Sequence, residues 1–133
     1  MSLQRGLTTY RQTQVQSRTP LELVVMLYDG ALTFLHQARA AIERGDIAAR
    51  RDASSRAIAI ISELQSTLNM EQGGEIAQRL DDLYVYVNGR IIAAAAENRV
   101  GPIDDATRVL TVLRESWVAI ATPAAEAPVR GAA

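Results

Sequence analysis

Helix start and stop signals divide most of this 133-residue sequence into four long segments joined by short connections. The first segment begins at Thr19-Pro20-Leu21-Glu22, which combines a capping box with proline at the first helical position. It runs to about Arg44, because Gly45 can adopt the left-handed conformation that ends a helix. The second and third helices are expected at about residues 46–69 and 75–98, with breaks at Gln72-Gly73-Gly74 and Gly101-Pro102. The fourth has Asp104 and Asp105 in its first turn and ends near Ala121.

Long helices with short connections must run antiparallel to their neighbours in the chain. The sequence therefore predicts an all-α fold, an antiparallel up-down bundle of four helices. No run alternates Val, Thr and aromatic residues as strands do, and apolar residues make up 48% of the chain, enough for a core. We expect three parts: a mobile N-terminal arm (1–18), the bundle (19–121) and a disordered tail rich in Pro and Ala (122–133).

The composition excludes several classes of protein. A net charge of −1 does not indicate a basic surface for nucleic acid. All 14 basic residues are arginine. The absence of cysteine removes disulfides, thiol catalysis and cysteine-ligated zinc. The N-terminus lacks the apolar core of a signal peptide, and no run approaches the roughly 20 apolar residues of a membrane span. We therefore expect a soluble, cytoplasmic protein that does not insert into a membrane.

No motif predicts a catalytic residue, a cofactor or a metal site. A di-metal enzyme built on a helical bundle needs inward-facing Glu-x-x-His pairs, but the one histidine, His36, has Thr33 three residues before it. Asp81 and Asp82 are adjacent, so their side chains point about 100° apart and do not form a carboxylate pair. We therefore expect no enzymatic activity, and keep a metal-dependent bundle enzyme only as a third hypothesis.

The first helix has more apolar surface than one face of a bundle requires. Residues 21–35, LELVVMLYDGALTFL, place apolar side chains around an arc of about 200°, whereas a core-facing stripe needs about 100°. In the third helix, Val85 and Ile92 point nearly opposite to the expected core stripe, and Tyr86 points sideways. That stripe consists of Ile76, Leu80, Leu83, Tyr84, Val87, Ile91 and Ala94.

The second and fourth helices have narrower apolar faces. The inner face of the second helix includes the small residues Ala53, Ser54 and Ala57. In the fourth helix, Val109 and Val112 lie off the seam that is expected to face the core. That seam is formed by Ile103, Ala106, Leu110, Leu113, Trp117 and Ile120.

Apolar side chains outside the core indicate a partner, because exposed apolar bands normally mark an interaction site. A central helix that touches two neighbours would account for the first helix, but it explains Val85 and Ile92 less well. Such grooves accept an amphipathic helix from another protein. In the alternative, the surplus faces of two copies cover each other in a homo-oligomer. The candidate partner-binding residues are Leu23, Leu27 and Phe34 in the first helix, Val85, Tyr86 and Ile92 in the third, and Val109 and Val112 in the fourth.

Short motifs follow one another along residues 7–121. They begin with Tyr10-Arg11-Gln12, Ser17-Arg18-Thr19-Pro20-Leu21-Glu22-Leu23 and Met26-Leu27-Tyr28-Asp29-Gly30-Ala31. They continue with Ala41-Ile42-Glu43-Arg44-Gly45-Asp46, Ala57-Ile58-Ala59-Ile60-Ile61-Ser62-Glu63-Leu64, Leu68-Asn69-Met70-Glu71-Gln72-Gly73-Gly74-Glu75-Ile76-Ala77, Leu83-Tyr84-Val85-Tyr86 and Trp117. In this order the motifs resemble the flagellin export chaperone family, FliS. The departures are Val87-Asn88-Gly89-Arg90, where the family often has two basic residues, and Ala94-Ala95, where it has Ala-Asn.

The resemblance implies a four-helix bundle that binds the C-terminal segment of newly made flagellin in the cytoplasm. Such a chaperone prevents premature polymerisation and assists delivery to the flagellar type III export apparatus, whose export gate is then a further partner. The resemblance also implies that the N-terminal arm can lie over part of the groove. Leu7 and Tyr10 are therefore added as arm residues that affect partner access. A homodimer in the absence of client stays open within the homo-oligomer alternative.

Overall fold

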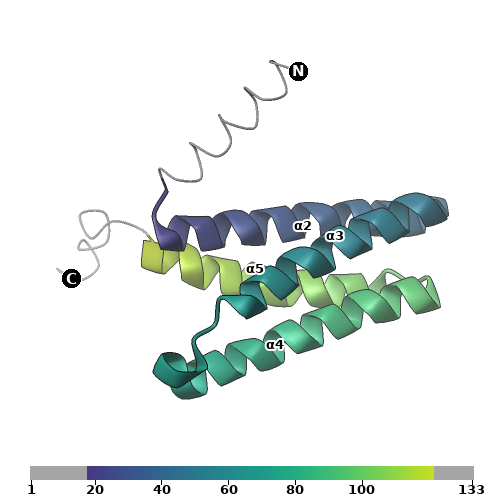
Figure 1. The fold of residues 1–133 in the computed structure, drawn as a ribbon. Coiled ribbons are helices and arrows are strands. Elements are labelled where there is room, and N and C mark those ends of the chain that lie inside the picture. Colours follow the sequence, from purple (N-terminus) through teal and green to yellow (C-terminus); the bar gives the residue numbers. More distant parts are fainter. Residues whose placement is uncertain (1–17, 122–133) are drawn as a thin grey trace, which may run out of the picture.

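The structure is a computed structural model that describes residues 18–121, and within this range it contains four long helices and no strand. The helices are α2 (Pro20–Arg44), α3 (Ile47–Ser66), α4 (Met70–Glu97) and α5 (Gly101–Ala121). Extensive interfaces join α2 to α3, α3 to α4, α4 to α5 and α5 to α2, which closes the helices around a common core. The predicted antiparallel bundle is confirmed, and α2 begins at the end of the bundle where α5 ends (Figure 1).

The first helix begins and ends where the sequence predicts. The Thr19 hydroxyl accepts a hydrogen bond from the Glu22 backbone N–H at 3.1 Å, and the Glu22 carboxylate accepts one from the Thr19 N–H at 2.9 Å. These two bonds form the capping box and satisfy backbone donors that a helix start leaves unpaired. At the other end, Gly45 has φ 73°, the left-handed conformation that stops the helix.

The connection between α3 and α4 differs from the prediction. The second helix stops at Ser66 rather than near Asn69, and Asn69 caps a new turn, its side-chain oxygen accepting from the Gln72 N–H at 3.0 Å. This turn is followed by a kink at Gly74, whose φ of 50° and ψ of −124° are accessible mainly to glycine. A Cβ on Gly73 would lie 2.7 Å from the Ala77 Cβ, so the kinked turn also requires glycine there. The predicted break is therefore correct, but the capped turn before it was missed.

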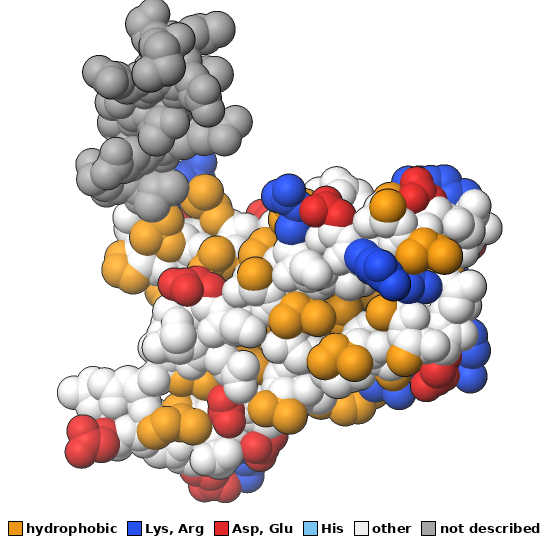
Figure 2. Space-filling model, turned by 45° about the vertical axis from the view of Figure 1, so that its right-hand side comes forward, with side chains coloured by type: hydrophobic (Ala, Val, Ile, Leu, Met, Phe, Trp, Pro, Cys, Tyr) orange, Lys and Arg blue, Asp and Glu red, His pale blue; other side chains and the backbone are white. Residues whose placement is uncertain are grey.

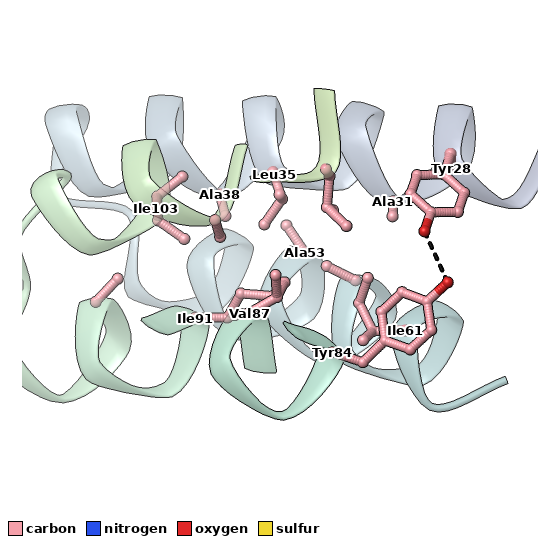
Figure 3. Close-up of a cluster of buried hydrophobic side chains, with 14 of the residues drawn as sticks. Tyr28, Ala31, Leu35, Ala38, Ala53, Ile61, Tyr84, Val87, Ile91 and Ile103 are labelled. Atoms are coloured by element: carbon pink, nitrogen blue, oxygen red, sulfur yellow. Dashed lines mark hydrogen bonds between the residues drawn. The ribbon is translucent and has the colours of Figure 1, made fainter. Parts of the chain in front are cut away.

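The core runs along the bundle axis and receives side chains from every helix (Figure 3). The predicted stripe of α4 is buried from Tyr84 to Ala94, and the small residues Ala53, Ser54 and Ala57 of α3 are buried as expected. Three predicted core positions were wrong. Ile76 and Ile120 lose their opposite wall because α4 spreads away from α2 and α5 towards its N-terminus (Figure 1), whereas Leu83 lies at helical spacing from Arg90, on the side of α4 that borders α5. Ile76 is 73% exposed, Leu83 36% and Ile120 61%.

Candidate partner-binding surface

An apolar cavity of about 750 Å³ occupies the end of the bundle where α4 diverges. All four helices contribute to it, because the first turns of α2 and the last turns of α3 and α5 face the kinked start of α4 without filling the space between them. We call this region the cavity end of the bundle. Its lining includes Leu21, Leu23, Val24 and Leu27 of α2, Glu63 and Leu64 of α3, Ile76, Leu80 and Tyr84 of α4, and Trp117 of α5.

A pair of buried tyrosines lies beside this cavity, which Tyr84 lines. The hydroxyl oxygens of Tyr28 and Tyr84 are 2.7 Å apart, and their ring centroids are 6.4 Å apart (Figure 3). Both residues are at most 1% exposed. Burial raises the pKa of both hydroxyls above the ordinary tyrosine value of 10.0, and the hydrogen bond with Tyr28 raises the pKa of Tyr84 further. The pair therefore joins α2 to α4 as a neutral, hydrogen-bonded unit.

The tyrosine pair predicts a loss of stability in alkaline solution. The chain contains no lysine and no cysteine, so tyrosines are the side chains that titrate between pH 9 and 11. The unfolded chain releases its tyrosine protons above pH 10, whereas the raised pKa values of Tyr28 and Tyr84 retain them in the folded state. The free energy of unfolding, undiminished below pH 10, should then fall by about 1–3 kcal/mol by pH 11.

Urea unfolding at pH 8 and pH 11 measures this effect. Changing both tyrosines, Tyr28→Phe with Tyr84→Phe, should remove most of the pH dependence, because neither buried group can then ionise. Tyr84→Phe alone should cost about 1–2 kcal/mol at pH 8, since it removes one of the two side chains, Tyr84 and Trp117, that interact with the buried Tyr28 hydroxyl. Equal stability of the unmodified protein at the two pH values would contradict the prediction.

The predicted partner-binding residues of α2 do not lie together. Leu23 and Leu27 line the cavity. Phe34 is half-buried farther along α2, where the Arg56 guanidinium of α3 lies 5.7 Å from the centre of its ring. A cation over the face of an aromatic ring stabilises that ring in place. Phe34 therefore belongs to the interface between α2 and α3 rather than to the cavity.

The predicted residues of α4 and α5 form two apolar flanks, one on each side of α4. Val85 and Ile92, each 57% exposed, make the first flank. Both lie at helical spacing from Asp81, which accepts a hydrogen bond from Gln65 of α3 at 2.9 Å, so this flank borders α3. Figure 2 shows hydrophobic side chains in separate groups on the face of the molecule turned towards the viewer.

The second flank borders α5. Arg90 of α4 donates to Asp105 of α5 at 2.8 Å, and the antiparallel register set by this pair places Tyr86 opposite Val109. Tyr86 is 47% exposed and Val112 61%, whereas Val109 is half-buried in the interface. The two flanks and the cavity together surround α4 with apolar surface. The remaining predicted residues, Leu7 and Tyr10, lie outside the described residues.

Sequence reasoning missed part of the cavity. Leu80, Tyr84 and Trp117 were assigned to the core, because periodicity shows which face of a helix is apolar but not where two helices diverge. The available signal was local: the paired glycines before Ile76 mark the kink that holds the start of α4 away from the bundle. The cavity is thus the open end of the predicted core.

The described part of the chain lacks both a cluster of metal ligands and a helix that could cross a membrane. Between residues 18 and 121, no group of three or more His, Asp or Glu side chains is placed to hold a metal ion. His36 is exposed on α2. None of the four helices is both long enough and apolar enough to cross a membrane.

Comparison with known proteins gives the family. The family model described as "Flagellar protein FliS" matches residues 3–124. A flagellar secretion chaperone FliS of Salmonella typhimurium is 37% identical over 124 residues, 90% of this chain and 92% of that protein. Proteins with the same name from Bacillus subtilis and Campylobacter jejuni are 33% and 37% identical and cover 88% and 81% of this chain, and 86% and 84% of their own. The chain therefore belongs to the FliS family of flagellar proteins.

Proposed function

We propose that this protein is a cytoplasmic chaperone that binds the C-terminal segment of flagellin. It prevents premature polymerisation of flagellin and assists its delivery to the flagellar type III export apparatus. The relatives that match most of the chain carry the name flagellar secretion chaperone, and this supports the proposal. The observation that carries it is the apolar surface around α4, made of the cavity and two exposed flanks. The function requires binding alone, with no cofactor and no chemical step.

The arrangement of this surface favours a client that wraps around the bundle. A single groove would accept one amphipathic helix along one pair of helices. Here Leu27 lies in the cavity, Val85 on the flank beside α3 and Val112 on the flank beside α5. A segment that alternates helical and extended parts can reach all three places. Leu7 and Tyr10, in the N-terminal segment, are proposed to affect access to them, and the export gate is a proposed further partner.

Calorimetric titration with a peptide of the C-terminal segment of flagellin from the same organism tests this function. We expect saturable one-to-one binding with a negative heat-capacity change, because apolar surface leaves water on binding. Light scattering of the protein alone tests the alternative, in which two copies cover each other's exposed side chains, such as Val85 and Ile92. A stable dimer that ignores the peptide would replace the chaperone proposal with a homo-oligomeric bundle.

A further inference from the structure

Acidic side chains lie at the cavity end of the bundle. Glu63 is the one charged residue among those that line it, and Glu71 lies in the capped turn beside the lining residue Gln72. Both are exposed, and neither forms an ion pair within residues 18–121. Glu75 follows in α4 and is paired with Arg79 at 2.6 Å. Glu63 and Glu71, which we call the acidic rim, therefore stand outside the ion pairs of this end of the bundle. Its arginines are fewer: Arg79 and Arg114 pair with Glu75 and Asp29, and Arg18 lies close in sequence to the lining residue Pro20.

The opposite end of the bundle is different. Arg39 pairs there with Asp104 at 2.8 Å and with Glu43 at 2.9 Å, so basic and acidic groups alternate. Arg44 and Asp46 form another such pair at 3.4 Å. In Figure 2, red side chains gather with orange ones over the start of α4, whereas blue side chains lie mainly towards the other end of the molecule. Acidic residues thus outnumber basic ones at the end of the bundle where the cavity opens.

From this charge distribution we infer that the cavity takes a segment whose apolar anchor is flanked by lysine or arginine. The apolar lining, with Leu23, Leu27 and Leu80, receives the anchor, and Glu63 and Glu71 face its basic neighbours. The inference rests on the proposed function, since the occupant is the client segment of the chaperone. A second copy presents an equally acidic cavity end, so like charges oppose the docking of two such ends.

Charge at an exposed rim acts mainly on the rate of association. Long-range attraction steers a charged partner towards its site and is screened by salt, whereas buried apolar contacts determine how slowly the partner leaves. The acidic rim should therefore accelerate capture of a basic segment at low ionic strength. It should have little influence on dissociation of the bound segment.

The test removes two negative charges at the cavity end and compares this variant with one that loses two negative charges at the opposite end. The rim variant carries Glu63→Gln and Glu71→Gln, and the control variant carries Glu43→Gln and Glu97→Gln at the opposite end, all at exposed positions. The probe is a peptide of the C-terminal segment of the organism's flagellin, with a second peptide in which every Lys and Arg is Gln. Stopped-flow mixing in about 50 mM and about 500 mM NaCl gives the association rate constants, because the Debye length falls from about 14 Å to about 4 Å between them.

We expect the rim variant to bind the natural peptide about 3- to 10-fold more slowly than the control at low salt, with the difference gone at high salt. The neutral peptide should not distinguish the two variants. Equal association rates of both variants with the natural peptide, or a client segment without basic residues, would overturn the inference while leaving the chaperone proposal intact. Failure of the unmodified protein to bind the peptide at all would instead refute the proposed function.

A third result would identify a different occupant. In the chain's own N-terminal segment, Arg5 and Arg11 flank the apolar residues Leu7 and Tyr10 in sequence. This segment therefore also has an apolar anchor with basic neighbours. If that segment fills the cavity, neutralising the rim would weaken its hold, and the flagellin peptide would bind faster to the rim variant than to the control. This outcome would overturn the inference that the acidic rim recruits the client.

Discussion

Changing Val85→Asp and Ile92→Asp together is expected to abolish client binding while the bundle stays folded. Both side chains are 57% exposed, whereas their neighbours Val87 and Ile91 are fully buried, so a charge is tolerated at the first two positions. Two carboxylates on the flank beside α3 would have to lose water against the apolar client. We expect affinity to fall on the order of 100-fold in calorimetry, with an unchanged helical circular dichroism signal.

Ile47 provides the matched control. It is 55% exposed at the start of α3, at the opposite end of the bundle from the cavity. Ile47→Asp should leave client affinity within a factor of two, because an exposed apolar residue outside an interface contributes little to binding. If the double variant unfolds, Val85 and Ile92 belong to the core; if it binds normally, the client does not use this flank.

The second large effect concerns stability. Leu35 of α2 is fully buried at the centre of the core (Figure 3), and Leu35→Ala is expected to lower the free energy of unfolding by about 2–5 kcal/mol. A value near the upper limit is expected, because α2 and α3 are already in close contact and cannot move together to fill the hole. A Cβ on Gly30, for example, would lie 3.1 Å from the Ile60 Cδ1 atom.

Urea unfolding at neutral pH measures this loss. Met26→Ala is the control, since Met26 is on the same helix but 37% exposed, and it should cost less than about 1 kcal/mol. Similar losses for the two variants would show that the centre of the core is more tolerant than its burial indicates.

The sequence predicted the fold where local chemistry decides it. Thr19 and Glu22 form their reciprocal cap, and Gly45 adopts its left-handed conformation, through contacts within a few residues of the chain. Periodicity likewise predicted the exposure of Val85 and Ile92, because a helix buries one face and these residues lie on another. The predicted end of the second helix near Asn69 was wrong for a local reason too. Asn69 acts as an N-cap and begins a new turn, and the previous helix has already ended at Ser66.

The cavity depends on the divergence of α4 from the other helices, which the sequence does not show directly. Ile76 and Ile120 continue their apolar stripes perfectly, yet both are exposed, because α4 diverges at that end of the bundle. Divergence depends on the summed volume of side chains between four helices and on the direction in which the kink at Gly74 turns the chain. The errors in assigning predicted residues to the core therefore include Ile76 and Ile120, both at the cavity end.

The order in which the helices meet has a consequence for how the bundle opens. The interfaces of α2 with α3, α3 with α4 and α4 with α5 join consecutive helices, whereas the interface of α2 with α5 joins segments far apart in the chain. Local contacts form early and at low entropic cost, and the closing contact carries the largest loop entropy. Release of α5 from α2 would withdraw Trp117 from the cavity wall while the other three helices stay joined. A bulky segment could then enter from the side without global unfolding of its chaperone.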